Sequence, residues 1–255
     1  MAQYPRYLTP KSERFDPLWL AEETAKIVCS GNMRKYTDFY AVGVYRGIAT
    51  AYTVGCNLRC YFCWVSPSRD FPEQYGEFYS AREVAEKLIA IAKKAGVKKA
   101  RISGGEPTIC REHLLGVLRI LAEEKFPLFI LETNGILFGK FPEYAKQAAD
   151  FENVYIRVSI KAGTAEKFEE KTGAIARSFE LQLRAVQALH DIGANFHVAL
   201  MADPRIMNKD ELRAVVHRIL EIDDWLARNI EYEVIDPYRM TLFRLDKAGV
   251  RLNWK

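Results

Sequence analysis

Six short apolar runs, each followed by a helical pattern, repeat along the chain from residue 48 onward. The runs cover residues 48–54, 97–102, 127–132, 153–160, 195–201 and 230–235. They are rich in β-branched and aromatic residues, as strands buried in a parallel sheet are. Ser80 and Asn208 each precede a glutamate by three residues, which is a helix-start signal. Since parallel strands need helical crossovers of this length, the repeat predicts an α/β fold with one parallel sheet.

The composition is that of one large globular domain. The chain has 255 residues, of which 49% are hydrophobic and 27% charged, and α/β barrels commonly have this length. The formal charge of +4 is too small to indicate nucleic-acid binding without a clustered patch. No apolar run approaches a membrane span, and residues 1–5 lack the order of a signal peptide. We therefore expect a protein without membrane association.

The cysteines are few and unevenly distributed. There are five, and three of them fall within eight residues. An odd number grouped in this way argues against a disulfide framework and for a reducing, cytoplasmic location. We accordingly expect Cys29 and Cys110 to be ordinary buried thiols.

The two ends of the chain do not follow the repeat. Residues 1–47 predict an extended lead-in, a helix from Pro17 to Gly31, and strand character over 35–46 that can pair as a hairpin with the run after Gly47. We expect an N-terminal extension over residues 1–47, a main domain over 48–240 and a tail over 241–255. The tail shows no pattern that we can interpret.

The three grouped cysteines, Cys56, Cys60 and Cys63, follow the first strand of the repeat directly. Gly55 allows a sharp turn out of that strand, which places the thiols in a loop. Three thiolates suit a thiophilic centre, and a four-iron cluster with three protein ligands keeps one iron open. The alternatives are a zinc site and a chance group of buried thiols. Zinc normally needs a fourth Cys or His nearby, and the first histidine downstream is His113.

Polar residues end the next three strands, and loops at the carboxyl ends of barrel strands build active sites. Gly104 and Gly105 allow a ligand to approach the backbone, and Glu106 offers an anionic acceptor for an ammonium group. The third strand ends in Glu132, Thr133 and Asn134, and the fourth in Ser159 and Lys161, which share one side of the strand. The alternatives are tight turns at Gly104–Gly105 and Asn134–Gly135, and a solvated surface lysine at Lys161.

The spacing Cys56-x3-Cys60-x2-Cys63, with Phe62 before the last cysteine, resembles the cluster loop of the radical S-adenosylmethionine (SAM) superfamily. The Gly-Gly-Glu-Pro sequence from Gly104 is similar to the motif that binds the SAM amino group in that family. Glu132-Thr-Asn-Gly resembles the enzymes that activate glycyl-radical proteins, and also some small-molecule members. The resemblance covers residues 48–235 and implies an open, partial (β/α)6 TIM-like barrel.

The resemblance also implies the cofactors and their ligands. Cys56, Cys60 and Cys63 are expected to hold one oxygen-sensitive [4Fe–4S] cluster, whose fourth iron chelates SAM. Ser159 and Lys161 resemble positions that contact the SAM ribose and carboxylate. The expected SAM contacts are Phe62, Gly104, Gly105, Glu106, Glu132, Thr133, Asn134, Ser159 and Lys161.

The implied activity is that of a single-cluster enzyme that cleaves SAM reductively to a 5′-deoxyadenosyl radical, which abstracts hydrogen from a substrate. A low-potential donor, flavodoxin or ferredoxin, is the expected partner. The substrate is left open between a glycyl-radical protein, a small molecule and a nucleoside in RNA. The long aromatic loop from Trp64 to Tyr79, with Arg69 and Phe71, is predicted to line its pocket. The alternative class is a non-catalytic metal-binding or nucleic-acid-binding module.

Overall fold

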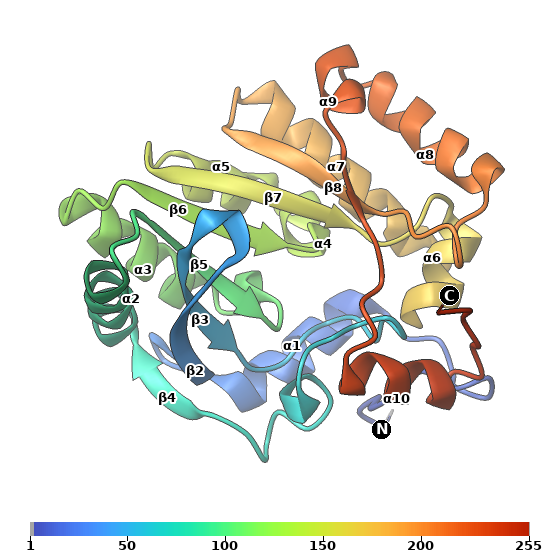
Figure 1. The fold of residues 1–255 in the computed structure, drawn as a ribbon, viewed down its shortest axis with the longest axis horizontal. Coiled ribbons are helices and arrows are strands. Elements are labelled where there is room, and N and C mark those ends of the chain that lie inside the picture. Colours follow the sequence, from blue (N-terminus) through green and yellow to red (C-terminus); the bar gives the residue numbers. More distant parts are fainter. Residues whose placement is uncertain (1–2, 255) are drawn as a thin grey trace.

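Six parallel strands form the centre of one curved sheet in the computed structural model, which describes residues 3–254. Neighbours in the sheet follow the order β3 (Ile48–Thr53), β5 (Lys99–Gly104), β6 (Leu128–Thr133), β7 (Val154–Ile160), β8 (Phe196–Met201) and β9 (Glu231–Glu233). Each strand lies within a few residues of its predicted range. The sheet curves without closing, because β9 pairs only with β8 within the described residues (Figure 1). The predicted α/β partial barrel is confirmed.

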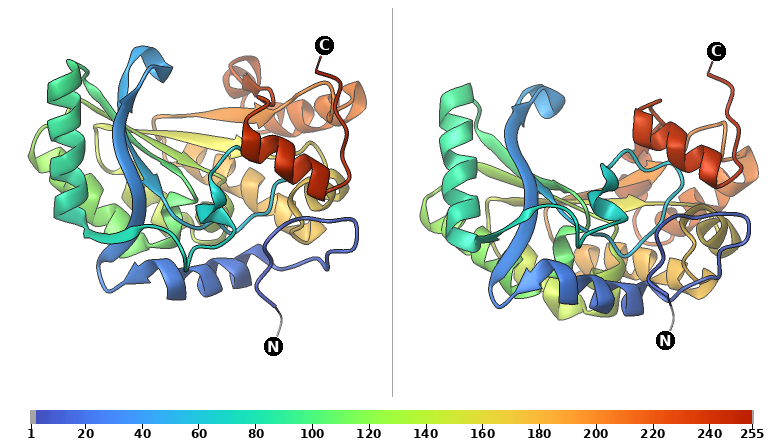
Figure 2. Two further views of the ribbon diagram at one scale, coloured as in Figure 1. Left: turned by 60° about the horizontal axis from the view of Figure 1, so that its bottom comes forward. Right: turned by 90° about the horizontal axis from the view of Figure 1, so that it is seen from below.

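The helices that connect the strands cover the convex face of the sheet (Figure 2). They are α2 (Ala81–Ala95), α3 (Arg111–Glu123), α4 (Ile136–Lys140), α5 (Pro142–Ala149), α6 (Ala165–Thr172), α7 (Phe179–Asp191), α8 (Lys209–Leu220) and α9 (Asp224–Arg228). The predicted starts are confirmed. The Ser80 hydroxyl accepts from the Glu83 amide while the Glu83 carboxylate accepts from the Ser80 amide, and the Asn208 side chain accepts from the Glu211 amide at 2.8 Å. These caps satisfy amides that would otherwise lack partners at the helix ends.

The two faces of the sheet differ in polarity because side chains alternate along each strand. Phe129, Leu131, Ile156 and Val158 are fully buried against the helices. Burial of each such side chain contributes roughly 1.5–3 kcal/mol to the stability of the folded state. The opposite, concave face carries charged and hydroxyl side chains, which include Arg101, Glu132 and Arg157. The concave face therefore supplies polar groups to the barrel interior.

The N-terminal segment extends the sheet. Helix α1 (Pro17–Val28) is capped by Asp16, and after β1 (Cys29–Ser30) the chain forms β2 (Met33–Val42), which pairs antiparallel with β3. The predicted helix and hairpin are thus present. A further strand, β4 (Glu77–Ser80), pairs with β2 and gives the end of the predicted loop its own structure. The domain boundaries at 47 and 240 stay predictions.

The C-terminal segment contains a helix that the sequence did not indicate. Helix α10 (Arg239–Lys247) lies beside the segment that carries the three cysteines, as both views in Figure 2 show. Arg244 and Leu245 are buried on its inner face, while Leu242 and Phe243 are exposed. Among the helices of residues 3–254, none has the length and apolarity needed to cross a membrane.

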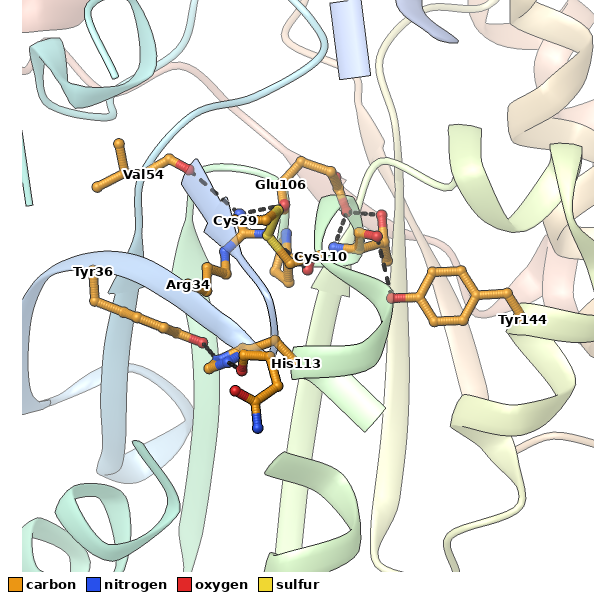
Figure 3. Close-up of a disulfide and its surroundings, with 11 residues drawn as sticks. Cys29, Arg34, Tyr36, Val54, Glu106, Cys110, His113 and Tyr144 are labelled. Carbon is orange, nitrogen blue, oxygen red and sulfur yellow. Dashed lines mark hydrogen bonds between the residues drawn. A yellow bond between two sulfur atoms is a disulfide. The ribbon is translucent and has the colours of Figure 1, made fainter. Parts of the chain in front are cut away.

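The expectation that Cys29 and Cys110 are free thiols is wrong. They form a disulfide between the end of α1 and the start of α3, with a Cα–Cα distance of 5.9 Å (Figure 3). Val28, Val54 and Cys110 pack together around this bond. The sequence argument failed because the fold brings together two cysteines that are 81 residues apart.

Candidate active site

The carboxyl ends of the parallel strands open into one cavity of about 270 Å³. Every residue that the sequence proposed as a cluster ligand or SAM contact lines this cavity: Cys56, Cys60, Phe62, Cys63, Gly104, Gly105, Glu106, Glu132, Thr133, Asn134, Ser159 and Lys161. They come from the ends of four neighbouring strands. The fold thus brings together motifs that lie up to 105 residues apart, from Cys56 to Lys161.

The cysteine loop and the Gly-Gly-Glu turn are held against each other through their backbones. The Gly105 amide donates to Thr53 O and the Glu106 amide to Gly55 O, both at 2.9 Å. A Cβ atom at Gly105 would lie 1.9 Å from Gly55 O, so only glycine permits this contact. Gly55 has a φ of +80°, which turns the chain out of β3 as predicted. The two glycines therefore fix the cysteine loop next to Glu106.

The three cysteines of the loop are free and differ in electrostatic environment. Burial raises the pKa of Cys56 to about 11 and that of Cys60 to about 12. Burial also opposes ionisation of Cys63, but Arg69 and Arg244 outweigh it and lower the pKa of this thiol. The Leu58 amide donates to Cys56 Sγ at 3.4 Å, a contact that favours a thiolate.

The donor set fits a cluster with three protein ligands. In the described part of the chain, no three Cys, His, Asp or Glu side chains are grouped so as to hold a metal ion. The three thiols instead line one shared cavity with Glu106 at its wall. Thiolates that bind separate irons of a cluster belong around a common space of this kind, because each coordinates its own iron.

Glu106 is the most heavily hydrogen-bonded carboxylate of the site. One oxygen accepts from the Thr108 amide and hydroxyl and from the Thr133 hydroxyl, and the other accepts from the Asn134 amide at 2.8 Å. The Glu106 side chain is buried. The guanidinium of Arg34, also buried, donates to the backbone carbonyl oxygen of Glu106 at 2.8 Å (Figure 3). Thr133 and Asn134, predicted as cofactor contacts, thus hold the Glu106 carboxylate in place.

The side chain of Asn134 links the third strand to the cysteine loop. Its amide nitrogen donates to Asn57 Oδ1 at 2.7 Å, and its oxygen accepts from the Ile136 amide at 3.0 Å. Both ends of the side chain therefore have protein partners. Glu132 is similarly engaged, since its oxygens accept from Arg101 at 2.7 Å, Ser103 at 2.8 Å and Tyr45 at 2.9 Å.

A second charged network begins on the adjacent strand, β7, where Arg157 is the register partner of Glu132, and extends to β9. Arg157 donates to both Glu231 and Glu233 at 2.8 Å, and Glu233 accepts from the Ser159 hydroxyl at 2.7 Å. Lys161 Nζ in turn contacts Ser159 Oγ. Burial opposes ionisation of Glu233, but Lys161 and Arg157 outweigh it and lower its pKa. The carboxylate thus remains charged beside Lys161.

The loop after the cysteines reaches the cavity only with its first part. Trp64 lines the cavity and is 46% exposed, and its ring meets Tyr52 edge-on at 6.3 Å. Arg69 also lines the cavity but is buried and paired with Asp70. Phe71 packs edge-on against Tyr7 and is absent from the cavity lining, so its predicted place in the pocket is wrong.

Some cavity residues escaped the sequence analysis: Arg157, Met201, Glu233, Asp236, Tyr238 and Thr241. The available signal was the strand period. Arg157 lies two residues before Ser159, so both point to the same side of β7. Thr241, on α10, gave no signal, because no motif marks that helix.

Comparison with known proteins matches most of this chain to one family. The profile of the Radical SAM superfamily matches residues 50–219. A probable GTP 3′,8-cyclase of Archaeoglobus fulgidus is 34% identical over 134 residues, which cover 51% of this chain and 40% of that protein. The GTP 3′,8-cyclase of Peptoclostridium acidaminophilum is 29% identical over 195 residues, 72% of this chain and 53% of that protein. The chain spans about half the length of these relatives.

A solved structure supports the fold. Streptococcus suis SuiB bound to S-adenosylmethionine superposes with a TM-score of 0.59 at 15% identity, covering 79% of this chain and 42% of SuiB. At this identity the likeness concerns the arrangement of strands and helices alone.

Proposed function

This chain belongs to the radical SAM superfamily. We propose that it cleaves SAM in the cavity at the strand ends and modifies a nucleotide. Membership of the family implies a [4Fe–4S] cluster and SAM as cofactors, together with a reductant. When bound, the cluster and SAM supply an electron and, on reductive cleavage, a 5′-deoxyadenosyl radical that takes hydrogen from the substrate. The observation that carries the proposal is the single cavity shared by all the motif residues.

The residues of the chain would bind and orient these groups. Cys56, Cys60 and Cys63 would hold three irons. Glu106, kept as an oriented carboxylate by its four donors, would pair with the ammonium group of SAM. Lys161, which contacts the Ser159 hydroxyl, would pair with the SAM carboxylate.

Two acidic side chains of the cavity wall are paired with arginines. Glu132 and Glu233 are both held by arginines, so they present an oriented and largely neutralised surface to the substrate. Such a surface keeps the polar groups of the wall in fixed positions toward a bound substrate.

The substrate class rests on two observations. The relatives that match are named GTP 3′,8-cyclases. At the cavity lip, Trp64 meets Tyr52 edge-on, and Tyr52 stacks on Tyr40 at 4.9 Å. An exposed aromatic side chain at an active-site entrance can stack on a nucleobase. Activation of a glycyl-radical protein, suggested by Glu132-Thr-Asn-Gly, is the second candidate.

The test is anaerobic reconstitution with iron and sulfide, followed by incubation with SAM and dithionite. We expect a brown protein that forms 5′-deoxyadenosine and methionine, whereas a zinc protein would be colourless. Turnover should rise when GTP or a related nucleotide is added, and deuterium from a ribose-deuterated nucleotide should appear in 5′-deoxyadenosine. Iron-loaded protein that forms no 5′-deoxyadenosine under these conditions would overturn the proposal. Reduced flavodoxin or ferredoxin is the physiological donor that we propose in place of dithionite.

Trp64→Ala tests the substrate side separately. We expect it to spare the slow cleavage of SAM without substrate and to suppress the nucleotide-dependent rate. Trp225→Ala is the matched control, because Trp225 is 58% exposed on α9 and does not line the cavity. An equal loss of both rates in Trp64→Ala would instead assign this side chain a role in stability.

A further inference from the structure

Three buried arginines each hold the backbone carbonyl of a different cysteine in the loop. Arg59 Nη1 donates to Cys56 O at 2.7 Å and Arg69 Nη1 to Cys60 O at 2.8 Å. Cys63 O accepts from Arg244 Nη1 at 2.7 Å. Arg59 and Arg69 belong to the loop region itself. Arg244 comes from α10, 181 residues further along the chain.

Arg244 holds the exit of the loop at several points. Besides Cys63 O, it donates to Val65 O at 2.5 Å and to Ser66 O at 3.1 Å. Its other contact is an ion pair with Asp70, at 2.5 Å. The guanidinium is almost entirely buried, at 2% exposure for the residue. These bonds fix the backbone on both sides of Trp64 and leave Arg244 no freedom to move independently of the loop.

The three arginines that hold the loop outnumber the carboxylates that pair with them. Asp70 lies between Arg69 and Arg244 and pairs with both, so two buried cations share one carboxylate. Arg59 is buried on carbonyl oxygens, and no ion pair to it is seen in residues 3–254. Three positive charges against one negative leave an excess of two. A buried excess of charge is costly unless an opposite charge lies nearby.

We propose that Arg244 is a positioning residue for the cluster, which makes α10 part of the cofactor site although it lies outside the family match. Its guanidinium fixes the third cysteine through the backbone and places a positive charge beside an anionic cluster. Because the reduced cluster is one charge more negative than the oxidised one, this cation favours the reduced state. The inference rests on the proposed function, in which a cluster occupies the cavity.

The variants Arg244→Met and Arg244→Lys separate the two effects. Methionine keeps much of the buried volume but removes the charge and all five hydrogen bonds of Arg244. Lysine keeps the charge, but its one ammonium nitrogen has three donors and cannot make all the bonds that the three guanidinium nitrogens of Arg244 make. Leu245→Ala is the matched control, since Leu245 is buried on the same helix and its side chain belongs to the apolar core.

The readouts are iron and sulfide content after reconstitution, a redox titration of the cluster without SAM, and thermal unfolding of the apoprotein. At a fixed potential near the midpoint, we expect the ratio of reduced to oxidised cluster to fall about tenfold in Arg244→Met. That change corresponds to about 59 mV for a one-electron couple. Arg244→Lys should hold iron less well but titrate near the wild-type potential, and Leu245→Ala should lower thermal stability alone.

A wild-type potential together with wild-type iron retention in folded Arg244→Met would overturn the inference. If Arg244→Met does not fold, Arg244→Lys decides through iron retention, which should fall below that of Leu245→Ala. Equal retention in these two variants would also overturn it. Failure of the proposed function looks different, because the wild-type protein would then either take up no cluster or hold one and form no 5′-deoxyadenosine.

Discussion

Removal of the Cys29–Cys110 disulfide should destabilise the protein without affecting the cluster. The bond joins residues 81 apart, so it restricts a long loop in the unfolded chain. The chain-entropy relation for a loop of this size gives about 4.5 kcal/mol at 25 °C. The double variant Cys29→Ser/Cys110→Ser should lose stability of this order.

The assay is denaturant unfolding of the apoprotein, extrapolated to water, with and without a phosphine reductant. The unfolding midpoint of the wild-type protein should shift to a lower denaturant concentration when the disulfide is reduced. The double variant should unfold at that lower concentration both with and without the reductant. It is therefore the control for effects of the reductant on the other three cysteines. A loss below about 1 kcal/mol, or a double variant that still responds, would refute the reasoning.

The same variant tests whether the disulfide serves the site. Cys110 follows the short helix Pro107–Ile109, which itself follows Glu106, but its sulfur does not line the cavity. Arg34 holds the Glu106 and Pro107 carbonyls independently of the bond (Figure 3). We therefore expect reconstituted iron content and SAM affinity to be unchanged.

Three further predictions follow from the site and its surroundings. The cluster cysteines are Cys56, Cys60 and Cys63. Replacement of any one of them by alanine should abolish the broad absorption at ~400 nm and all SAM cleavage in an anaerobic assay. Glu106→Gln should weaken SAM binding by about 10- to 150-fold, because it loses a charge-assisted hydrogen bond worth roughly 1.5–3 kcal/mol, as measured by equilibrium binding to the iron-loaded protein. Burial lowers the pKa of His113 to about 4, so the unfolded chain takes up a proton first as the pH falls below about 6.5. Between pH 7 and 4.5 this should cost about 2–3 kcal/mol of unfolding free energy, a loss that denaturant titration should find reduced in His113→Gln.

The sequence was informative wherever a local signal determines the structure. Strand ranges follow from apolar runs, and helix starts follow from caps such as Ser80 with Glu83, because these bonds form between near neighbours. The site residues could be found for a related reason. All parallel strands end at the same edge of the sheet, so polar residues at successive strand ends must gather there.

The features that escaped prediction depend on contacts between distant segments. The Cys29–Cys110 bond and the contacts of Arg244 with the cysteine loop span 81 and up to 181 residues. In neither case does a motif in the surrounding sequence indicate the contact. Phe71 shows that a residue near the site in sequence can still point away from it. An aromatic side chain in a loop can pack against the cavity or against another segment, and Phe71 packs on Tyr7.

The polar interior of the barrel shows why an open sheet can keep its shape without a closing strand pair. Arg157 on β7 reaches past β8 to Glu231 and Glu233 on β9, the last strand, whose backbone pairing with β8 is short. Glu233 is mostly buried, so loss of Arg157 would leave its carboxylate with Lys161 and Ser159 alone. The exposed Glu231 would keep its contact with His197. The ion pairs therefore do for the edge strand what a neighbouring strand does in a closed barrel, and they hold Glu233 at the wall of the cavity at the same time.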